Sequence, residues 1–200
     1  MIARVVGGRQ DKVASGRPTQ ADLQAAYGAQ IPDLLGPQMR VLLVGINPSL
    51  YSGWTGRHFA RPGNRLWRTL HEAGFSDRLL HPSESEAILA AGLGITNLVA
   101  RSTARADELS DAEIRAGVDP LRRLVLRCRK KWAQPSYVAF LGISTYRVAF
   151  GLPKAVVGEQ AERFAGSGVW VLPNPSGLNA HYQQPQLTAA YAALRQAIAR

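Results

Sequence analysis

The chain has 200 residues, of which 46% are hydrophobic and 19% charged, and its formal net charge of +10 comes mostly from arginine. This length supports one domain with one core, and the composition is that of an ordinary globular protein. The single cysteine, Cys128, excludes an internal disulfide framework and a four-thiolate metal site. No segment resembles a signal peptide or a membrane span, so we expect a cytoplasmic protein, associated with the nucleoid if the source is bacterial.

The first 30 residues differ in composition from the rest of the chain. They contain glycine, proline and basic residues with little apolar periodicity, which is typical of a mobile, solvated arm. We therefore expect a basic arm over residues 1–30 and a single domain over residues 31–200. The positive charge favours a nucleic-acid partner, because arginine pairs well with phosphate. Arginine-rich codon usage in a GC-rich genome would produce the same charge.

Residues 41–46 form the clearest predicted strand. They are a continuous apolar run that ends in Asn47 and a proline, a pattern typical of a strand buried on both faces and closed by a turn. Residues 47–64 are expected to form a long loop rich in glycine and aromatic residues, and such loops are more often functional than accidental. A helix should follow, with Asn64 as its N-cap and Gly74 at its end.

Strands and helices alternate along the remainder of the chain. Capping-box spacing predicts one helix that begins at Ser83, with Glu86, and another that begins at Ser110, with Glu113. Gly117 and Pro120 interrupt the second, which is therefore either kinked or divided into two helices, with Asp119 as the cap of the latter. The other expected strands are residues 95–99, 137–141 and 169–172, and the other expected helices are residues 144–150 and 186–199, with the polar residues 156–168 outside the sheet. This alternation predicts an α/β fold, a three-layer sandwich with a short, mainly parallel four-stranded sheet flanked by helices.

Two of the predicted strands end in similar sequences. The first is followed by Asn47 and the fourth by Asn174, each next to proline. Because the carboxyl ends of parallel strands share one edge of a sheet, where ligands bind in open α/β folds, the two loops should face one cleft. Leu178 would then be an exposed apolar residue of the kind that wedges into a base stack. The alternative is that both Asn-Pro pairs are turn residues and that Leu178 folds onto the core.

Two segments carry a family resemblance. The sequences GINPSLYSGWTGRHFARPGNRLW, residues 45–67, and VWVLPNPSGLN, residues 169–179, resemble the mismatch-specific uracil/thymine-DNA glycosylases of the uracil-DNA glycosylase superfamily. The resemblance extends from about residue 31 to the C-terminus. It implies a monomeric, monofunctional glycosylase with no metal or cofactor, whose partner is double-stranded DNA containing uracil mismatches.

The resemblance also implies roles for individual residues. Asn47 would position the water that attacks C1′ of a flipped nucleotide, Ile46 would contact the base through its backbone, and Phe59 would stack on it. Asn174 would hydrogen-bond in or beside the base pocket. The loop that fills the gap in the duplex and contacts the orphaned guanine would contain Ser176, Gly177, Leu178 and Asn179.

Residues that flank the first motif bear on specificity. Ser49 and Tyr51 depart from the pattern of the family, so they are expected to shape the pocket and change which bases fit. Arg57 and Arg61 lie beside the first loop in the sequence and are expected to contact phosphates.

Asp107 is a second candidate for a catalytic role. Asn47 is a neutral amide that cannot take a proton, so a carboxylate reaching the cleft would help to activate water. The alternative is that Asp107 only precedes the next helix and favours its dipole.

Three kinds of function remain open from the sequence. The first is excision of uracil, especially opposite guanine, which leaves an abasic site. The second is a non-catalytic nucleic-acid-binding module of the same fold, in which Asn47 is only a turn residue. The third is hydrolysis of small nucleotides in the same cleft.

Overall fold

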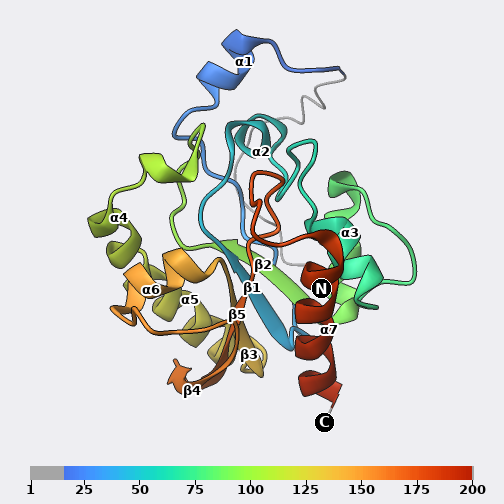
Figure 1. Cartoon of the computed structure of the whole chain (residues 1–200), viewed down its shortest axis with the longest axis vertical. Coiled ribbons are helices and arrows are strands. Elements are labelled where there is room, and N and C mark those ends of the chain that lie inside the picture. The colour runs from blue at the N-terminus through green and yellow to red at the C-terminus, as the bar shows by residue number, and fades with distance from the viewer. Residues whose placement is uncertain (1–15, 200) are drawn as a thin grey trace.

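The computed structural model of the chain describes residues 16–199, whose helices and loops surround one five-stranded sheet (Figure 1). The strands are β1 (Val41–Gly45), β2 (Leu93–Asn97), β3 (Tyr137–Leu141), β4 (Gly158–Phe164) and β5 (Ser167–Leu172). They lie in the order β2-β1-β3-β5-β4, and all are parallel except β4, which pairs antiparallel with β5 at one edge. The predicted α/β fold with a mainly parallel sheet is confirmed.

The fifth strand, β4, corrects the prediction of a four-stranded sheet. Residues 156–168 were expected to lie outside the sheet, but β4 and the start of β5 form a hairpin there. Ala165 and Gly166 between the strands both have positive φ, 52° and 92°, as the tightest hairpin turns require. β4 was missed because it is an edge strand with mostly exposed, charged side chains rather than an apolar run. Charged edges of this kind hinder pairing with another chain.

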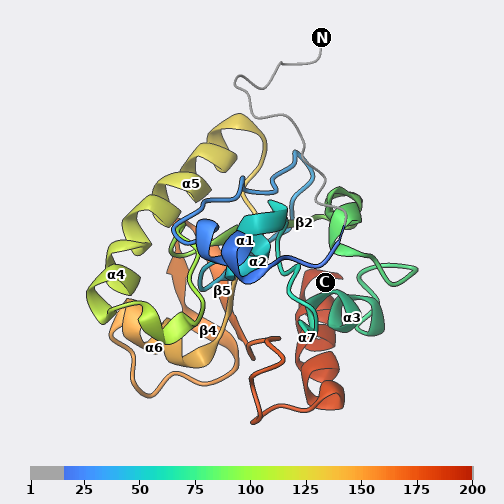
Figure 2. The same cartoon turned by 90° about the horizontal axis from the view of Figure 1, so that it is seen from above.

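Helices cover both faces of the sheet and make three layers (Figures 1 and 2). One face carries α3 (Leu66–Glu72), the 3-10 helix η1 (Pro82–Ala91) and α7 (Gln184–Ala199), and the other carries α4 (Asp111–Ala116), α5 (Val118–Lys131) and α6 (Ile143–Phe150). Alternate residues of β1 face opposite layers: Leu43 packs with α3 and α7, and Leu42 packs with α5 and α6. Burial on both sides explains why this strand is apolar throughout.

The helix boundaries were predicted in part. The capping box of Ser110 and Glu113 is present. The predicted interruption at Gly117 is confirmed, since α4 ends and α5 begins there, but the cap between them is Gly117 and not Asp119. A Cβ at Gly117 would collide with the carbonyl oxygen of Leu98, so only glycine fits at this position. The box expected at Ser83 and Glu86 is wrong, since His81 and Glu84 form it instead. The helices expected near residues 144–150 and 186–199 correspond to α6 and α7.

Two short helices lie in segments where the sequence indicated irregular structure. α1 (Gln20–Ala25) begins with a capping box of Thr19 and Asp22, and α2 (Leu50–Thr55) begins at Ser49 within the predicted long loop. The two helices pack together at the top of the molecule in Figure 1. The basic arm was predicted over residues 1–30, and residues 1–15 of it lie outside the described residues. In the described part of the chain, no helix is both long and apolar enough to cross a membrane.

Candidate active site

Three neighbouring parallel strands, β1, β3 and β5, end at the same edge of the sheet. Ile46 follows β1, Gly142 follows β3 and Asn174 lies just beyond β5. A Cβ placed on Gly142 would lie 3.6 Å from Ile46 Cδ1 and 3.8 Å from Asn174 Cβ. The end of β3 is therefore the floor between the two Asn-Pro loops. Gly142 has a φ of 135°, so any other residue would be strained there.

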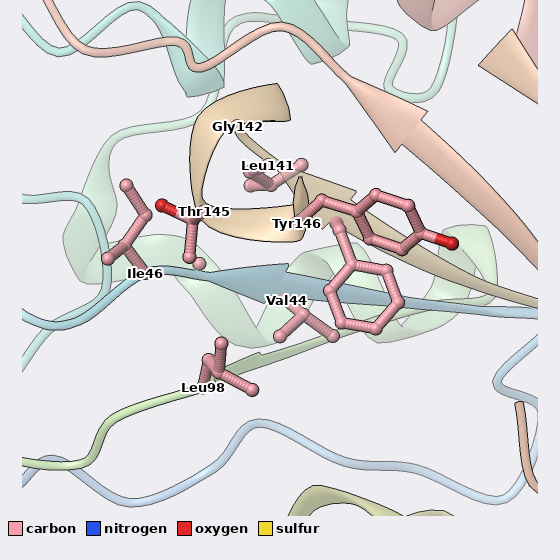
Figure 3. A pocket seen from close by; sticks show the side chains of 9 residues that line it. Val44, Ile46, Leu98, Leu141, Gly142, Thr145 and Tyr146 are labelled. Atoms are coloured by element: carbon pink, nitrogen blue, oxygen red, sulfur yellow. The ribbon is translucent and has the colours of Figure 1, made fainter. Parts of the chain in front are cut away.

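A small apolar cavity lies beneath this floor (Figure 3). It has a volume of about 10 Å³ and is bordered by Val44, Ile46, Leu98, Leu141 and Thr145, among others. That volume is roughly the space needed by one water molecule. The cavity is therefore too small for a ligand larger than water.

Asn47 is held rigidly through its amide nitrogen. Its Nδ2 donates to the carbonyl oxygen of Arg101 at 3.0 Å and to Thr103 Oγ1 at 2.7 Å. The Thr103 hydroxyl donates its own proton to the carbonyl oxygen of Arg105 at 2.7 Å, so it can only accept from Asn47. Both partners are thus acceptors, which fixes the orientation of the amide. Its Oδ1 accepts no hydrogen bond from residues 16–199 and is the atom offered to a ligand or water.

The loop that holds Asn47 is itself paired on both sides. On one side, Thr103 N donates to Pro48 O and Leu50 N donates to Thr103 O, each at 3.1 Å. On the other side, fully buried Ser102 pairs with residues 26–29 next to α1. Its hydroxyl donates to the carbonyl oxygen of Ala26, its N–H donates to that of Ala29 at 2.9 Å, and its own carbonyl accepts from Gly28 N at 3.0 Å.

Ser49 and Tyr51, the two residues that flank the first motif, belong to α2. The Ser49 hydroxyl accepts from Ser52 N at 3.2 Å as the N-cap of the helix and also contacts Ser52 Oγ at 3.1 Å. The Tyr51 ring meets that of Trp54 edge to face, with 5.6 Å between centroids. These contacts give both residues a structural role in α2 beside the site.

Phe59 lies over the end of β1. Its Cζ would be 3.0 Å from a Cβ placed on Gly45, so the ring occupies the space that a side chain there would fill. Phe59 also has a φ of 52°, which is unusual for a bulky residue and costs free energy. Strained backbone of this kind is concentrated at functional sites, which makes Phe59 a candidate for ligand contact.

The neighbouring residue, His58, is buried and ties the backbone next to Phe59 to Pro32. It is 4% exposed, and its Nε2 lies 2.9 Å from the carbonyl oxygen of Pro32. Because a carbonyl can only accept, Nε2 carries the proton, and Nδ1 is a buried acceptor that has no partner among residues 16–199. Burial lowers the pKa of His58, and the carbonyl of Pro32 and the charge of Asp33 oppose that shift only in part.

We expect His58 to make the protein less stable in mild acid. The lowered pKa means that the unfolded chain takes up a proton more readily than the folded one, so stability falls as the pH drops through the ordinary value near 6.5. Urea unfolding midpoints at pH 7 and pH 5 measure this loss. In His58→Gln, which keeps a donor for Pro32, the loss should be smaller, whereas exposed His181→Gln should behave as wild type. Equal losses in all three proteins would contradict the assignment.

Asn174 and the residues after it form the second loop. Asn174 Oδ1 accepts from Ser176 N at 2.9 Å, and the carbonyl oxygen of Asn174 accepts from Asn179 Nδ2 at 2.9 Å. Within the described residues, Asn174 Nδ2 has no partner and remains a donor near the floor. Leu178 is 69% exposed at the tip of the loop, so it does not fold onto the core. A Cβ on Gly177 would lie 2.5 Å from the carbonyl oxygen of Gly63, so this loop sits directly on the first one.

The charged candidates have different surroundings. Asp107 is exposed and forms an ion pair with Arg105, and it makes no hydrogen bond to Asn47. Arg57 Nη1 donates to the carbonyl oxygen of Ser83 at 3.1 Å. Arg61 is exposed, and its side chain makes no hydrogen bond to any residue in the described range, which leaves the guanidinium available to an anion.

Sequence reasoning missed several residues that shape the site. Gly142 could have been suspected, because a glycine directly follows an apolar run. The sequence contains no local signal for Thr103, which holds Asn47 from 56 positions away. Among residues 16–199, no cluster of three or more His, Cys, Asp or Glu side chains could hold a metal ion.

A wider open groove of about 560 Å³ lies between α3 and α7. Its central group is the Glu72 carboxylate, which accepts hydrogen bonds from Thr188 at 2.7 Å, Arg68 at 2.6 Å and Gln184 at 2.9 Å. These bonds lower the pKa of Glu72 to about 2. Because its lone pairs already serve to join two helices, we regard this groove as a helix contact and the strand ends as the candidate active site.

Comparison with known proteins agrees with this assignment of fold. The structure is similar to the solution NMR structure of a Methanosarcina acetivorans protein provisionally named a uracil DNA glycosylase, with a TM-score of 0.60 and 18% sequence identity. The match covers 87% of this chain and 99% of that chain, and at this identity it shows a shared fold. A family model described as the uracil DNA glycosylase superfamily matches residues 32–196, which include both Asn-Pro loops. The protein therefore belongs to the uracil DNA glycosylase superfamily.

Proposed function

We propose that this protein is a monofunctional DNA glycosylase that flips uracil, especially uracil opposite guanine, out of duplex DNA and hydrolyses its N-glycosidic bond. Members of the superfamily are DNA glycosylases. The observation that carries the proposal is Asn47, whose Nδ2 is fully used by Arg101 and Thr103 and whose Oδ1 is left as an acceptor at the sheet edge. We also propose that the protein acts as a monomer on double-stranded DNA.

In this mechanism Asn47 orients the attacking water. One O–H of the water donates to Oδ1, which directs an oxygen lone pair at C1′ of the flipped nucleotide. The C1′–N1 bond breaks, the C1′–O bond forms, and uracil leaves as an anion that takes up the proton released by the water. Asn47 remains neutral throughout, because an amide cannot act as a base. Its contribution is therefore orientation.

The leaving base needs donors and a surface to stack on. The free Nδ2 of Asn174 and the backbone of Ile46 would stabilise the negative charge on uracil, and Phe59 would stack on its ring. The base would lie above Ile46 and Gly142, because the cavity beneath them holds about one water. Ser49 and Tyr51 would act on base choice by setting the position of α2.

The second loop and nearby arginines would contact the DNA. Leu178 is exposed and apolar, so it suits insertion into the space that the flipped nucleotide leaves. Ser176, Gly177 and Asn179 would line that space and meet the orphaned guanine. Arg57 and Arg61 would contact phosphates, with Arg61 the freer of the two.

A substrate panel tests the proposal. The protein is incubated with a duplex that contains a single G·U pair, and abasic sites are revealed by alkaline cleavage. Matched arms contain A·U, G·T and free deoxyuridine. Release of uracil from G·U faster than from A·U supports the proposal. Salt-sensitive duplex binding without abasic product would indicate a binding module, and activity on free nucleosides alone would indicate a small-molecule hydrolase.

We expect Asp107→Asn to retain the rate of wild type within about threefold. The carboxylate is exposed, pairs with Arg105 and makes no hydrogen bond to Asn47, so it is not held where it could take a proton from the attacking water. Single-turnover rates on the G·U duplex at several pH values measure the effect. A large loss of rate that follows the titration of a carboxyl group would instead place Asp107 in the mechanism. It would then activate water, as the sequence alone suggested.

A further inference from the structure

Arg65 makes more hydrogen bonds to the second loop than to its own helix. It lies just before α3, and its side chain is half-buried. Nη1 donates to the carbonyl oxygen of Tyr182 at 2.7 Å, and Nη2 donates to those of Ser176 at 2.7 Å and Asn179 at 3.0 Å. Its backbone N–H donates to the carbonyl oxygen of Pro175 at 2.9 Å. One residue thus contacts four carbonyl groups of the segment 175–182.

This arrangement differs from that of a phosphate-binding arginine. The guanidinium fork is turned into the protein, and its partners are main-chain carbonyls, which no sequence change in the loop removes. Hydrogen bonds from a charged donor are stronger than neutral ones, and a planar fork reaches several acceptors that a lysine could not. Arg68 lies three residues further along the chain, on the exposed side of α3. It pairs with Glu72 instead of the loop.

The loop that Arg65 holds carries Leu178 at its exposed tip. Gly177, beside Leu178, has no room for a side chain against the carbonyl oxygen of Gly63. Residues 63–65 therefore support the loop in two ways, through close backbone contact at Gly63 and through the guanidinium of Arg65. An apolar side chain at the end of an otherwise irregular loop would lose entropy on insertion into DNA, and a loop that is already ordered loses less.

We propose that Arg65 is a positioning residue of the reaction, which holds residues 175–182 in the conformation that directs Leu178 into the duplex. It acts through the loop and touches neither the base nor the sugar. The inference rests on the proposed function, because it assigns a purpose to the loop only if the protein flips a nucleotide. It predicts that Arg65 and Leu178 contribute to the same step.

A double-mutant cycle on the G·U duplex tests this coupling. Under single-turnover conditions Arg65→Gln and Leu178→Ala should each slow uracil release by about tenfold, and the double variant should be little slower than either one. Arg65→Lys should resemble Arg65→Gln, because the single nitrogen of a lysine lacks the planar fork that places Nη1 and Nη2 against different carbonyls. Arg68→Gln, on the same helix, is the matched control and should retain the rate of wild type. Multiplicative losses in the double variant, or a loss in Arg65→Gln with none in Leu178→Ala, would overturn the inference.

Hydrogen exchange in the free protein gives a second measurement that needs no activity. Arg65→Gln should speed the exchange of amides in residues 176–182 and leave β1 and β3 protected as in wild type. Unchanged exchange in the loop, or faster exchange throughout the molecule, would overturn the positioning role. Arg65→Lys, which keeps the charge but not the guanidinium, should give the same local change and replaces Arg65→Gln if that variant fails to fold. If Arg65→Gln shows the local exchange effect while the wild-type protein releases no uracil, the proposed function is refuted separately from the hold of Arg65 on the loop.

Discussion

Replacing Asn47 by alanine should slow uracil release from a G·U duplex by about a thousandfold, the size of effect seen when one preorganised polar group is removed from an active site. The truncation removes Oδ1, the acceptor that would orient the water, and it leaves the carbonyl of Arg101 and the hydroxyl of Thr103 without their donor. Binding to the duplex should change little, because phosphate contacts supply most of the affinity. Single-turnover rates and titrations at fixed salt separate the two effects.

The matched control removes a side-chain amide that lies outside the candidate site. Gln196 is exposed on α7, and its side chain makes no hydrogen bond within the described range of residues, so Gln196→Ala should keep both the rate and the affinity of wild type. Urea unfolding of each variant checks the fold. A normal rate in Asn47→Ala would remove this residue from the mechanism, and a parallel loss of rate and duplex affinity would make it a binding residue.

Replacing Thr103 by valine should slow the reaction by between about tenfold and a hundredfold, as expected when a reacting group is misplaced by a fraction of an ångström or more. Valine has nearly the same shape but no hydroxyl, so Asn47 keeps only its bond to the Arg101 carbonyl. The amide can then rotate and exchange the positions of its nitrogen and oxygen. The maximal single-turnover rate should fall. The enzyme concentration that gives half of this maximal rate, which reports binding, should stay the same.

Thr103→Ser provides the rescue. It restores the hydroxyl that accepts from Asn47 and donates to Arg105, and it should recover most of the rate. If serine is as slow as valine, packing of the threonine methyl group at this 1% exposed position is what matters, and the hydroxyl has no part in holding Asn47.

The fold was predictable where the chain has strong local patterns. β1 is apolar at every position because it is covered on both faces, and that pattern stands out in the sequence. β4 lacks such a pattern because its side chains are mostly exposed at an edge, where pairing with β5 decides its structure. α2 was missed because it is short and contains Gly53, a poor helix former, and its stability comes from the Ser49 cap and contact with α1.

In the candidate site, only the residues that directly follow predicted strands could be found from the sequence. Asn47 and Asn174 stand at recognisable boundaries between apolar runs and proline turns, so their positions could be inferred. Thr103 and Arg65 could not, because their partners are 56 and 111 to 117 positions away. Arg65 also lies in the sequence between Arg61 and Arg68, whose side chains are exposed in the structure. Its role depends on tertiary contacts that composition does not encode.

The pairing of Ser102 with residues 26–29 has a consequence for how the site assembles. Ala26 and Ser102 are 76 positions apart, and contacts between distant parts of a chain form slowly because closing a long loop costs entropy. Residues 26–29 can dock only after Ser102 is in place, and only then is the loop that holds Asn47, at Ser102 and Thr103, paired on both sides. Proteolytic trimming beyond residue 26 should therefore impair catalysis while the sheet stays folded. The position of Asn47 thus depends on residues near the start of the described chain.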